Sequence, residues 1–312
     1  MQFIVSNYSG KLEGHNLQDR IRELQRQRNA VIVAHNYQRD EVQEIADYIG
    51  DSLGLSQEAA KSRADVIIFC GVHFMAETAS ILSPDKRVLM PDDSAGCPMA
   101  NMIMAESLRA LKKNHPKASV VCYVNTTAEV KAESDVCCTS SNAVEVVQSV
   151  DGSEVIFVPD KYLAHYVSTK TDKKIIPWYG YCPTHARILP EHIERQKKLH
   201  PEAEVYVHPE CTPGVIALAD RVLSTGGMCS YAKESKASEI IIGTEVGILY
   251  RLRKENPGKS FYPASENAVC PNMKLTTLEK ILWSLQEMQF EIKVPQDIRL
   301  KAKKAVDKMM SL

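Results

Sequence analysis

Two kinds of motif recur in this chain with a period of about 87 residues. A cysteine precedes a proline at three positions, 85 and 88 residues apart, which are Cys97, Cys182 and Cys270. A short β-branched run ends in two polar residues spaced i, i+2, and these pairs are His35 and Tyr37, Tyr123 and Asn125, and His208 and Glu210. The period is far longer than that of a solenoid repeat, so it indicates one domain present in three copies.

The apolar runs before these polar pairs have the pattern of buried parallel strands. Further strand candidates alternate with helical segments, which predicts small parallel sheets that place ligands beyond the carboxyl ends of their strands. We therefore expect an α/β fold of three similar sandwich-like domains with short parallel sheets in a pseudo-threefold arrangement. The expected copies span residues 1–112 (with an N-terminal helix), 113–198 and 199–274, and C-terminal helices at 275–312 pack back on the body.

The charge balance narrows the classes of partner. The chain has 38 basic and 39 acidic residues, a net charge of -1, which gives no support for a nucleic-acid or membrane surface. No segment approaches the roughly 18–20 apolar residues that span a bilayer, and the first ten residues lack the basic and apolar regions of a secretory signal. We expect a cytoplasmic protein whose nine cysteines are mostly thiols.

The cysteines fall into two groups. Six precede no proline and are expected to be buried core residues, namely Cys70, Cys122, Cys137, Cys138, Cys211 and Cys229. The three Cys-Pro cysteines would meet on the pseudo-threefold axis. The chain has no CxxC pair, which disfavours zinc, whereas three thiolates suit a [4Fe–4S] cluster with one open iron that acts as a Lewis acid.

The loops around these cysteines carry further polar candidates. Each strand-end pair places both side chains on one face of its strand, and Glu210 is the natural general base. Hydroxyl-rich strand ends that could bind a phosphate or carboxylate contain Ser52, Ser140 and Thr225. His73 and His185 are second-line candidates. Pro98 can begin a helix directly after Cys97, whereas after Cys182 and Cys270 we expect the helix to begin several residues later.

Together these residues resemble the quinolinate synthase (NadA) family of NAD biosynthesis. The resemblance covers about residues 29–273 and consists of ordered pieces: AHNYQ at 34–38, GDSL at 50–53, FCGVHFMAETA at 69–79, AGCP at 95–98, YVNT at 123–126, TSSNAV at 139–144, PDKYLA at 159–164, HPEC at 208–211 and STGGM at 224–228. Some family members carry a CxxCxxC triplet where this chain has only Cys270.

The resemblance implies an enzyme that condenses iminoaspartate with dihydroxyacetone phosphate to give quinolinate, phosphate and water. It implies three α/β domains around one [4Fe–4S] cluster held by Cys97, Cys182 and Cys270. The implied substrate-binding positions are His35, Ser52, Tyr123, Asn125, Ser140, His208, Glu210 and Thr225. Tyr37 matches a tyrosine implicated in proton transfer, and with Glu210, His35 and His208 it completes the expected catalytic set. An aspartate-oxidising enzyme would supply iminoaspartate.

Three other classes of function stay open on the sequence alone. A cluster-dependent hydro-lyase acting on another small acid would share the open iron but need no phosphate site near Ser140 and Thr225. An iron–sulfur sensor or electron carrier would want four thiolates or a basic nucleic-acid-binding face. A thiol protein without metal would leave the three cysteines free.

Overall fold

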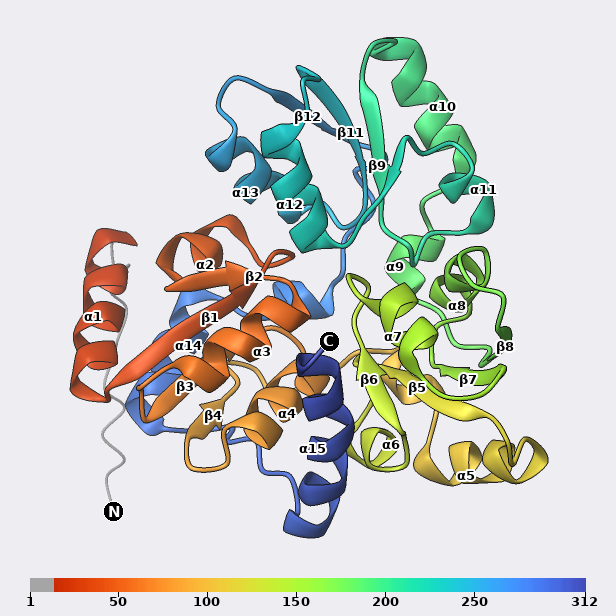
Figure 1. Ribbon diagram of the computed structural model, residues 1–312. Helices are drawn as coiled ribbons and strands as arrows, with labels where there is room; N and C mark the ends of the chain where they lie inside the picture. The colour runs from red at the N-terminus through yellow and green to blue at the C-terminus, as the bar shows by residue number, and fades with distance from the viewer. Residues whose placement is uncertain (1–13) are drawn as a thin grey trace, which may run out of the picture.

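The computed structural model describes residues 14–312, and it shows three lobes of similar build around a common centre (Figure 1). Each lobe has its own four-stranded sheet. The first sheet contains β1 (Ala30–His35), β2 (Tyr48–Gly50), β3 (Val66–Cys70) and β4 (Arg87–Leu89). The second contains β5 (Ser119–Tyr123), β6 (Val136–Cys138), β7 (Glu154–Val158) and β8 (Lys174–Pro177). The third contains β9 (Glu204–Val207), β10 (Arg221–Val222), β11 (Glu239–Gly243) and β12 (Ser260–Pro263).

The three sheets have the same topology. Their strand orders are β2-β1-β3-β4, β6-β5-β7-β8 and β10-β9-β11-β12, and all neighbouring strands are parallel. The first strand of each copy is therefore central, and its carboxyl end carries the polar pair. This confirms the predicted α/β fold of three similar domains with short parallel sheets.

Helices connect and cover the strands. In the first copy they are α1 (Gly14–Gln27), α2 (Asp40–Ile45), α3 (Ser52–Lys61), α4 (His73–Leu82) and the 3-10 helix η1 (Ala100–Met102). In the second they are α5 (Ala105–Asn114), α6 (Ala128–Ala132), α7 (Ala143–Ser149), α8 (Lys161–Ser168) and α9 (Pro183–Ala186). In the third they are α10 (Pro190–Leu199), α11 (Pro213–Ile216), α12 (Thr225–Glu234), α13 (Ile248–Glu255) and η2 (Asn272–Lys274), and α14 (Leu278–Glu287) and α15 (Gln296–Met310) follow.

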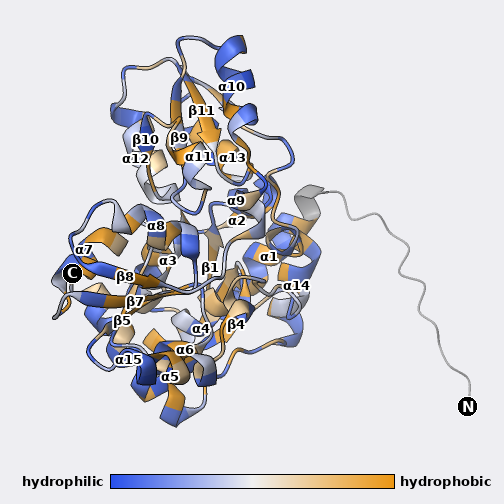
Figure 2. Cartoon of the chain, turned by 90° about the vertical axis from the view of Figure 1, so that its right-hand side faces the viewer, coloured by the Kyte–Doolittle hydropathy of each residue, from blue (hydrophilic) through white to orange (hydrophobic). Residues whose placement is uncertain are grey.

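Alternating side chains of the central strands pack into different layers of core. In β1, Val31 and Val33 join the cluster beneath α3 and α4, whereas Ile32 and Ala34 join the cluster beneath α1 and α14. Because successive residues of a strand point to opposite faces, a sheet covered on both faces needs a continuous apolar run. The strands accordingly lie as apolar bands inside each lobe, with polar residues along the outer helices (Figure 2).

The C-terminal helices join the copies. Helix α14 packs against α1, and α15 packs against α4, α6 and β6, so it spans the first and second copies (Figure 1). The expected copy boundaries at 112/113 and 198/199 fall in the last turns of α5 and α10, and they stay predictions. No helix in residues 14–312 has the length and apolarity to cross a membrane, and the segment used to argue against a secretory signal lies outside the described residues.

Two local expectations are wrong. A helix begins directly after Cys182, which is the N-cap of α9, with Pro183 as its first residue. After Cys97 the chain instead runs through a turn before η1 begins at Ala100. The Cys-Pro pair permits an immediate helix at each site, and the local path of the loop decides whether one forms.

Candidate active site

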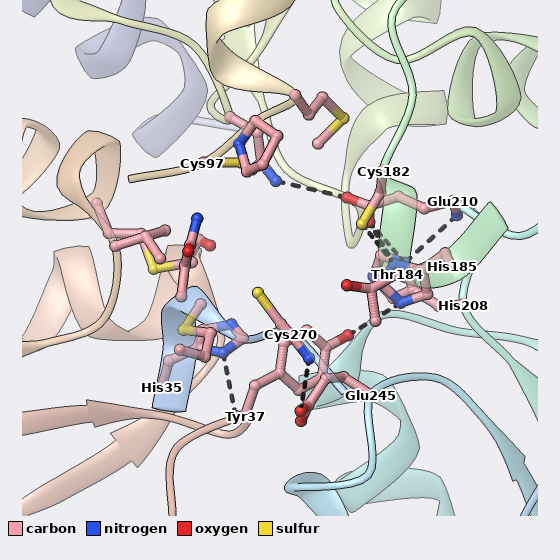
Figure 3. Close-up of a pocket in the computed structure, with 18 of the residues that line it drawn as sticks. His35, Tyr37, Cys97, Cys182, Thr184, His185, His208, Glu210, Glu245 and Cys270 are labelled. Carbon is pink, nitrogen blue, oxygen red and sulfur yellow. Dashed lines mark hydrogen bonds and ion pairs between the residues drawn. The ribbon is translucent and has the colours of Figure 1, made fainter. Parts of the chain in front are cut away.

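One cavity of about 360 Å³ lies where the three copies meet. It opens at the carboxyl ends of the sheets, as expected for parallel α/β structures. The second-line candidate His73 does not line it, whereas every residue of the expected catalytic, substrate-binding and ligand sets does: His35, Tyr37, Ser52, Cys97, Tyr123, Asn125, Ser140, Cys182, His208, Glu210, Thr225 and Cys270. Figure 3 shows the sulfur atoms of the three cysteines pointing into this space from three sides. The pseudo-threefold arrangement thus brings together residues separated by as many as 235 positions.

The histidines of the first and third copies have the same local geometry. The Nδ1 atom of His35 accepts the backbone N–H of Tyr37 at 3.2 Å, and Nδ1 of His208 accepts that of Glu210 at 3.3 Å. Since Nδ1 accepts, each neutral ring carries its proton on Nε2. His208 Nε2 lies 3.1 Å from Oγ of Ser140. Both strand ends therefore present an N–H donor, which suits a carboxylate or phosphate.

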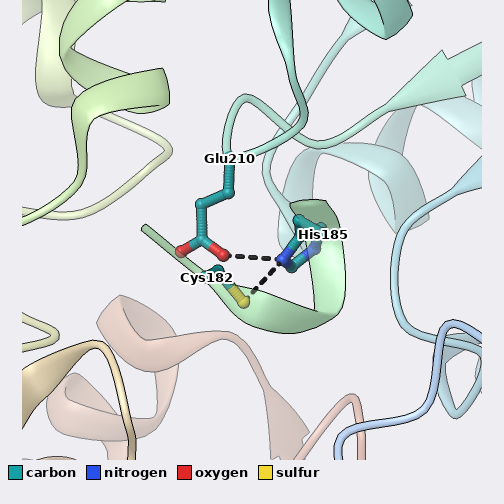
Figure 4. A group of neighbouring side chains, drawn as sticks. All are labelled: Cys182, His185 and Glu210. Carbon is teal, nitrogen blue, oxygen red and sulfur yellow. Dashed lines mark hydrogen bonds and ion pairs between the residues drawn. The ribbon is translucent and has the colours of Figure 1, made fainter. Parts of the chain in front are cut away.

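A chain of hydrogen bonds crosses from the first copy to the third. The hydroxyl of Tyr37 lies 2.5 Å from Oγ1 of Thr244, which lies 2.7 Å from Nε2 of His185. Nδ1 of His185 lies 2.7 Å from Oε2 of Glu210 (Figure 4). With Nδ1–H donating to the carboxylate, Nε2 accepts from Thr244, and Thr244 accepts from Tyr37. This arrangement can carry a proton from the tyrosine to the imidazole.

Burial sets the charge of these groups. Desolvation lowers the pKa of His35 and of His208 to about 3, so both are neutral near pH 7. Burial alone would raise the pKa of Glu210, but His185 and His208 beside it lower that pKa to about 2. Burial also raises the pKa of Tyr37 and of Tyr123 well above the usual value. Glu210 is therefore a carboxylate facing two protonated phenols, and the Tyr123 hydroxyl donates to it at 2.6 Å.

The three thiols are partly buried and free of disulfides. Burial raises the pKa of Cys97 to about 12 and raises those of Cys182 and Cys270 as well. A metal that binds here must displace these protons. Cys182, His185 and Glu210 also offer ligand atoms within 4.8 Å of one another, a spacing that could hold a single ion (Figure 4). The six other cysteines are buried, as expected.

The cavity lining carries groups that can bind anions beside three acidic side chains, Asp51, Glu210 and Glu245. Among the described residues that line it, Arg187 is the only lysine or arginine, and its side chain is exposed. The first residues of α3 and α12, Ser52 and Thr225, also line the cavity, so the N-terminal ends of both helices point toward it. Exposed N–H groups and the helix dipole at such ends attract negative charge.

Comparison with known proteins shows which family the chain belongs to. Residues 19–311 match the family described as "Quinolinate synthetase A protein". The chain belongs to this family. Proteins named quinolinate synthase from Dehalococcoides mccartyi (strain CBDB1), Methanosarcina barkeri and Thermodesulfovibrio yellowstonii are 60%, 58% and 59% identical to it. The alignments cover 93–94% of this chain and 96–97% of each relative. The resemblance stated from the motifs is thus confirmed, and the family is one of enzymes.

Of the residues in the hydrogen-bonded chain from Tyr37 to Glu210, the sequence did not indicate Thr244 and indicated His185 only as a second-line candidate. Thr244 follows the third strand of its sheet, and nothing in its sequence context distinguishes it from a strand-end hydroxyl. His185 was ranked below the strand-end histidines, although it lies three residues after Cys182. One turn of α9 turns its ring toward Glu210, and a Cys-Pro-x-His spacing was the available signal.

Proposed function

We propose that this protein is a quinolinate synthase, which condenses iminoaspartate with dihydroxyacetone phosphate and releases quinolinate, phosphate and water in NAD biosynthesis. The observation that carries the proposal is one shared cavity, to which each copy contributes one thiol and one strand-end pair. Its histidine, hydroxyl and arginine donors match substrates with two carboxylates and a phosphate. The names of the relatives support the same reaction.

Cys97, Cys182 and Cys270 would hold a [4Fe–4S] cluster. The donor set fits, because three thiols from three copies converge on one cavity and the other six cysteines of the chain are buried in the core. When bound, such a cluster with one open iron supplies a Lewis acid that polarises a hydroxyl or carboxylate oxygen. A single ion on Cys182, His185 and Glu210 fits less well, since the two latter side chains already pair at 2.7 Å.

The chain's own residues would bind the substrate and move protons. The Nε2–H groups of His35 and His208 would orient carboxylates, and Asn125 and Ser140 would complete the binding surface. Tyr37 would give up or take a proton through Thr244 and His185, and the ionised Glu210 would stabilise the imidazolium that forms. Glu210 would thus act mainly by orienting the His185 ring and stabilising its protonated form, because a carboxyl group with a pKa of about 2 is a weak base near pH 7.

Iron and sulfide analysis after anaerobic reconstitution tests the ligand set. Cys97→Ser, Cys182→Ser and Cys270→Ser should each lose most of the cluster, while His185→Ala keeps it and loses turnover. Cys211→Ser is the matched control, because Cys211 is a buried thiol outside the cavity lining. The opposite pattern, with metal lost in His185→Ala and kept in Cys97→Ser, would assign a single ion to Cys182, His185 and Glu210.

The substrates are tested separately on the reconstituted protein. Quinolinate should form from dihydroxyacetone phosphate together with iminoaspartate, which an aspartate-oxidising enzyme supplies in the assay. Dehydration of another small hydroxy acid, without quinolinate formation, would favour a cluster-dependent hydro-lyase. Protein that stays colourless and iron-free after reconstitution would favour a thiol protein.

A further inference from the structure

The three Cys-Pro loops are fastened to their sheets by one repeated backbone contact. A backbone N–H shortly after the third strand of each copy donates to the carbonyl two residues before the cysteine. These contacts are His73 to Ala95 at 2.9 Å, Lys161 to Gly180 at 2.8 Å and Val246 to Ala268 at 3.0 Å. The repeat shows that the residues just before them, Val72, Asp160 and Glu245, occupy equivalent positions.

Two of these three equivalent residues are carboxylates that reach the cysteine itself. Asp160 accepts the backbone N–H of Cys182 at 3.2 Å, and Glu245 accepts that of Cys270 at 3.1 Å. Both side chains are fully buried. We propose that Asp160 and Glu245 are positioning residues that hold Cys182 and Cys270 in the geometry a bound metal group requires, which rests on the metal-binding role proposed above.

The remaining oxygens of both carboxylates anchor them to the sheet ends. Oδ1 of Asp160 accepts the N–H groups of Tyr162 and Leu163 at 2.8 and 2.7 Å, so it caps α8. Oε2 of Glu245 accepts the N–H of Gly247 at 2.7 Å and the ammonium of Lys274 at 3.3 Å. Lys274 also lies 3.0 Å from Oε1, the oxygen that bonds Cys270. Each carboxylate is thus fixed at one end by its own copy and bonds the cysteine with the other oxygen.

The second copy shows how closely the loop follows its strand. A Cβ on Gly180 would lie 2.5 Å from the carbonyl oxygen of Pro159, so the glycine allows the loop to approach the strand end. The backbone contact from Lys161 and the carboxylate contact from Asp160 then fix the loop on either side of Tyr181. A buried acceptor is needed here because an unpaired N–H away from water is costly.

Among the residues that the structure describes, the first copy has no carboxylate that accepts the backbone N–H of its cysteine. Val72 is buried and apolar, so it offers Cys97 no acceptor. The Cys97 loop is instead held from elsewhere: Asn272 donates to the carbonyl of Gly96 at 2.7 Å, and Asp92 binds Ser94 within the loop and pairs with Lys280 of α14. Neither Asp160 nor Glu245 touches the Cys97 loop, which is therefore an internal reference for changes at Asp160, whereas Asn272 links it to the Cys270 loop.

Amide hydrogen exchange read by mass spectrometry tests the proposal in the metal-free and the reconstituted protein. Asp160→Asn removes one of two acceptor oxygens and should speed exchange in the segment 178–186 about tenfold, with 266–273 and 93–100 unchanged. Glu245→Gln should speed exchange in 266–273 and leave 178–186 unchanged; 93–100 is not a reference for this variant, because Asn272 of the altered segment donates to Gly96. Asp135→Asn is the matched control, because Asp135 also accepts a backbone N–H, that of Val120 at 2.7 Å, at the amino end of its strand.

Each substitution should speed exchange in its own cysteine segment, and this distinguishes the loss of one positioning contact from a general destabilisation of the fold. Equal acceleration in all three cysteine segments, or none in the segment of the altered copy, would overturn the proposal. In reconstituted protein a chelator should remove iron faster from both variants than from Asp135→Asn. Wild-type protein that binds no iron would overturn the proposed cluster, while exchange in the metal-free protein would still decide whether the carboxylates hold the loops.

Discussion

At the scale of single residues, the proton chain predicts that Tyr37 acts through its hydroxyl. Tyr37→Phe keeps the ring and its packing against His35, so iron content should stay at the wild-type level while turnover falls about a hundredfold or more. Tyr206→Phe is the matched control, because this buried hydroxyl bonds Glu204 outside the cavity and its loss should leave turnover near wild type. Unchanged quinolinate formation in Tyr37→Phe would remove the tyrosine from the mechanism.

A substitution of Thr244, the next residue in the hydrogen-bonded chain, tests the route of the proton. Tyr37 Oη also lies 3.3 Å from Nε2 of His185, so a direct transfer competes with the path through Thr244. Thr244→Val removes the hydroxyl at nearly constant shape. A loss of turnover close to that of Tyr37→Phe would establish the threonine as a member of the chain, and turnover near wild type would assign the direct path.

At the scale of elements, helix α12 meets the first copy at Gly226, where an added Cβ would require the Asp51 side chain to move. A Cβ on Gly226 would lie 2.6 Å from Oδ2 of Asp51, the N-cap of α3. Gly226→Ala should therefore displace the Asp51 carboxylate, which caps α3 and lines the cavity, and lower kcat/KM about tenfold or more, because small misplacements of binding groups are costly. The adjacent Gly227→Ala, whose Cβ would lie 3.4 Å from Ser224, is the matched control and should keep kcat/KM near wild type.

A second substitution shows whether the contact with Asp51 is the cause. Asp51→Ser keeps an oxygen to cap α3 but shortens the side chain, so it should restore part of the kcat/KM lost in Gly226→Ala. Steady-state kinetics on the single and double variants measures this recovery. Equal losses in the single and the double variant would place the defect of Gly226→Ala elsewhere in α12.

Some strands and site residues could be predicted from the sequence, and others could not. The central strands and the residues at their ends could be predicted because a buried parallel strand leaves an apolar run and the same run occurs three times. The edge strands β2, β8 and β12 were not predicted, because their sequences carry weak apolar patterns. Asp160, Thr244 and Glu245 were not predicted either, since their roles depend on which loop folds over the end of each strand.

At the scale of the whole molecule, the buried histidines tie stability to pH. His35 and His208 bind protons near pH 6.5 when unfolded but only near pH 3 when folded. The unfolded chain therefore holds more protons between these values, and the free energy of unfolding falls as the pH drops, by about 1.4 kcal/mol per pH unit for each histidine. Glu210, whose pKa falls from 4.5 to about 2 on folding, adds a further loss below pH 4.5.

Urea unfolding of the metal-free protein between pH 4 and 7 measures this slope. His208→Asn should make the slope shallower by about 1.4 kcal/mol per pH unit, because one of the two protons is no longer taken up on unfolding. His165→Asn, on the exposed face of α8, is the matched control and should leave the slope unchanged. A slope that His208→Asn does not alter would show that this ring is already protonated in the folded protein.

Because three copies share one cavity, the cavity can form only after the third copy has been synthesised. Cys270 leaves the ribosome 173 residues after Cys97, which at typical rates of synthesis is roughly 9 to 35 s later. During that interval the first two thiols are present without their partner, and the chain has a partly built lining open to stray metal ions and oxidants. A chain that stops short of its third copy therefore has no complete site, and it also lacks α14 and α15, which pack against the first and second copies.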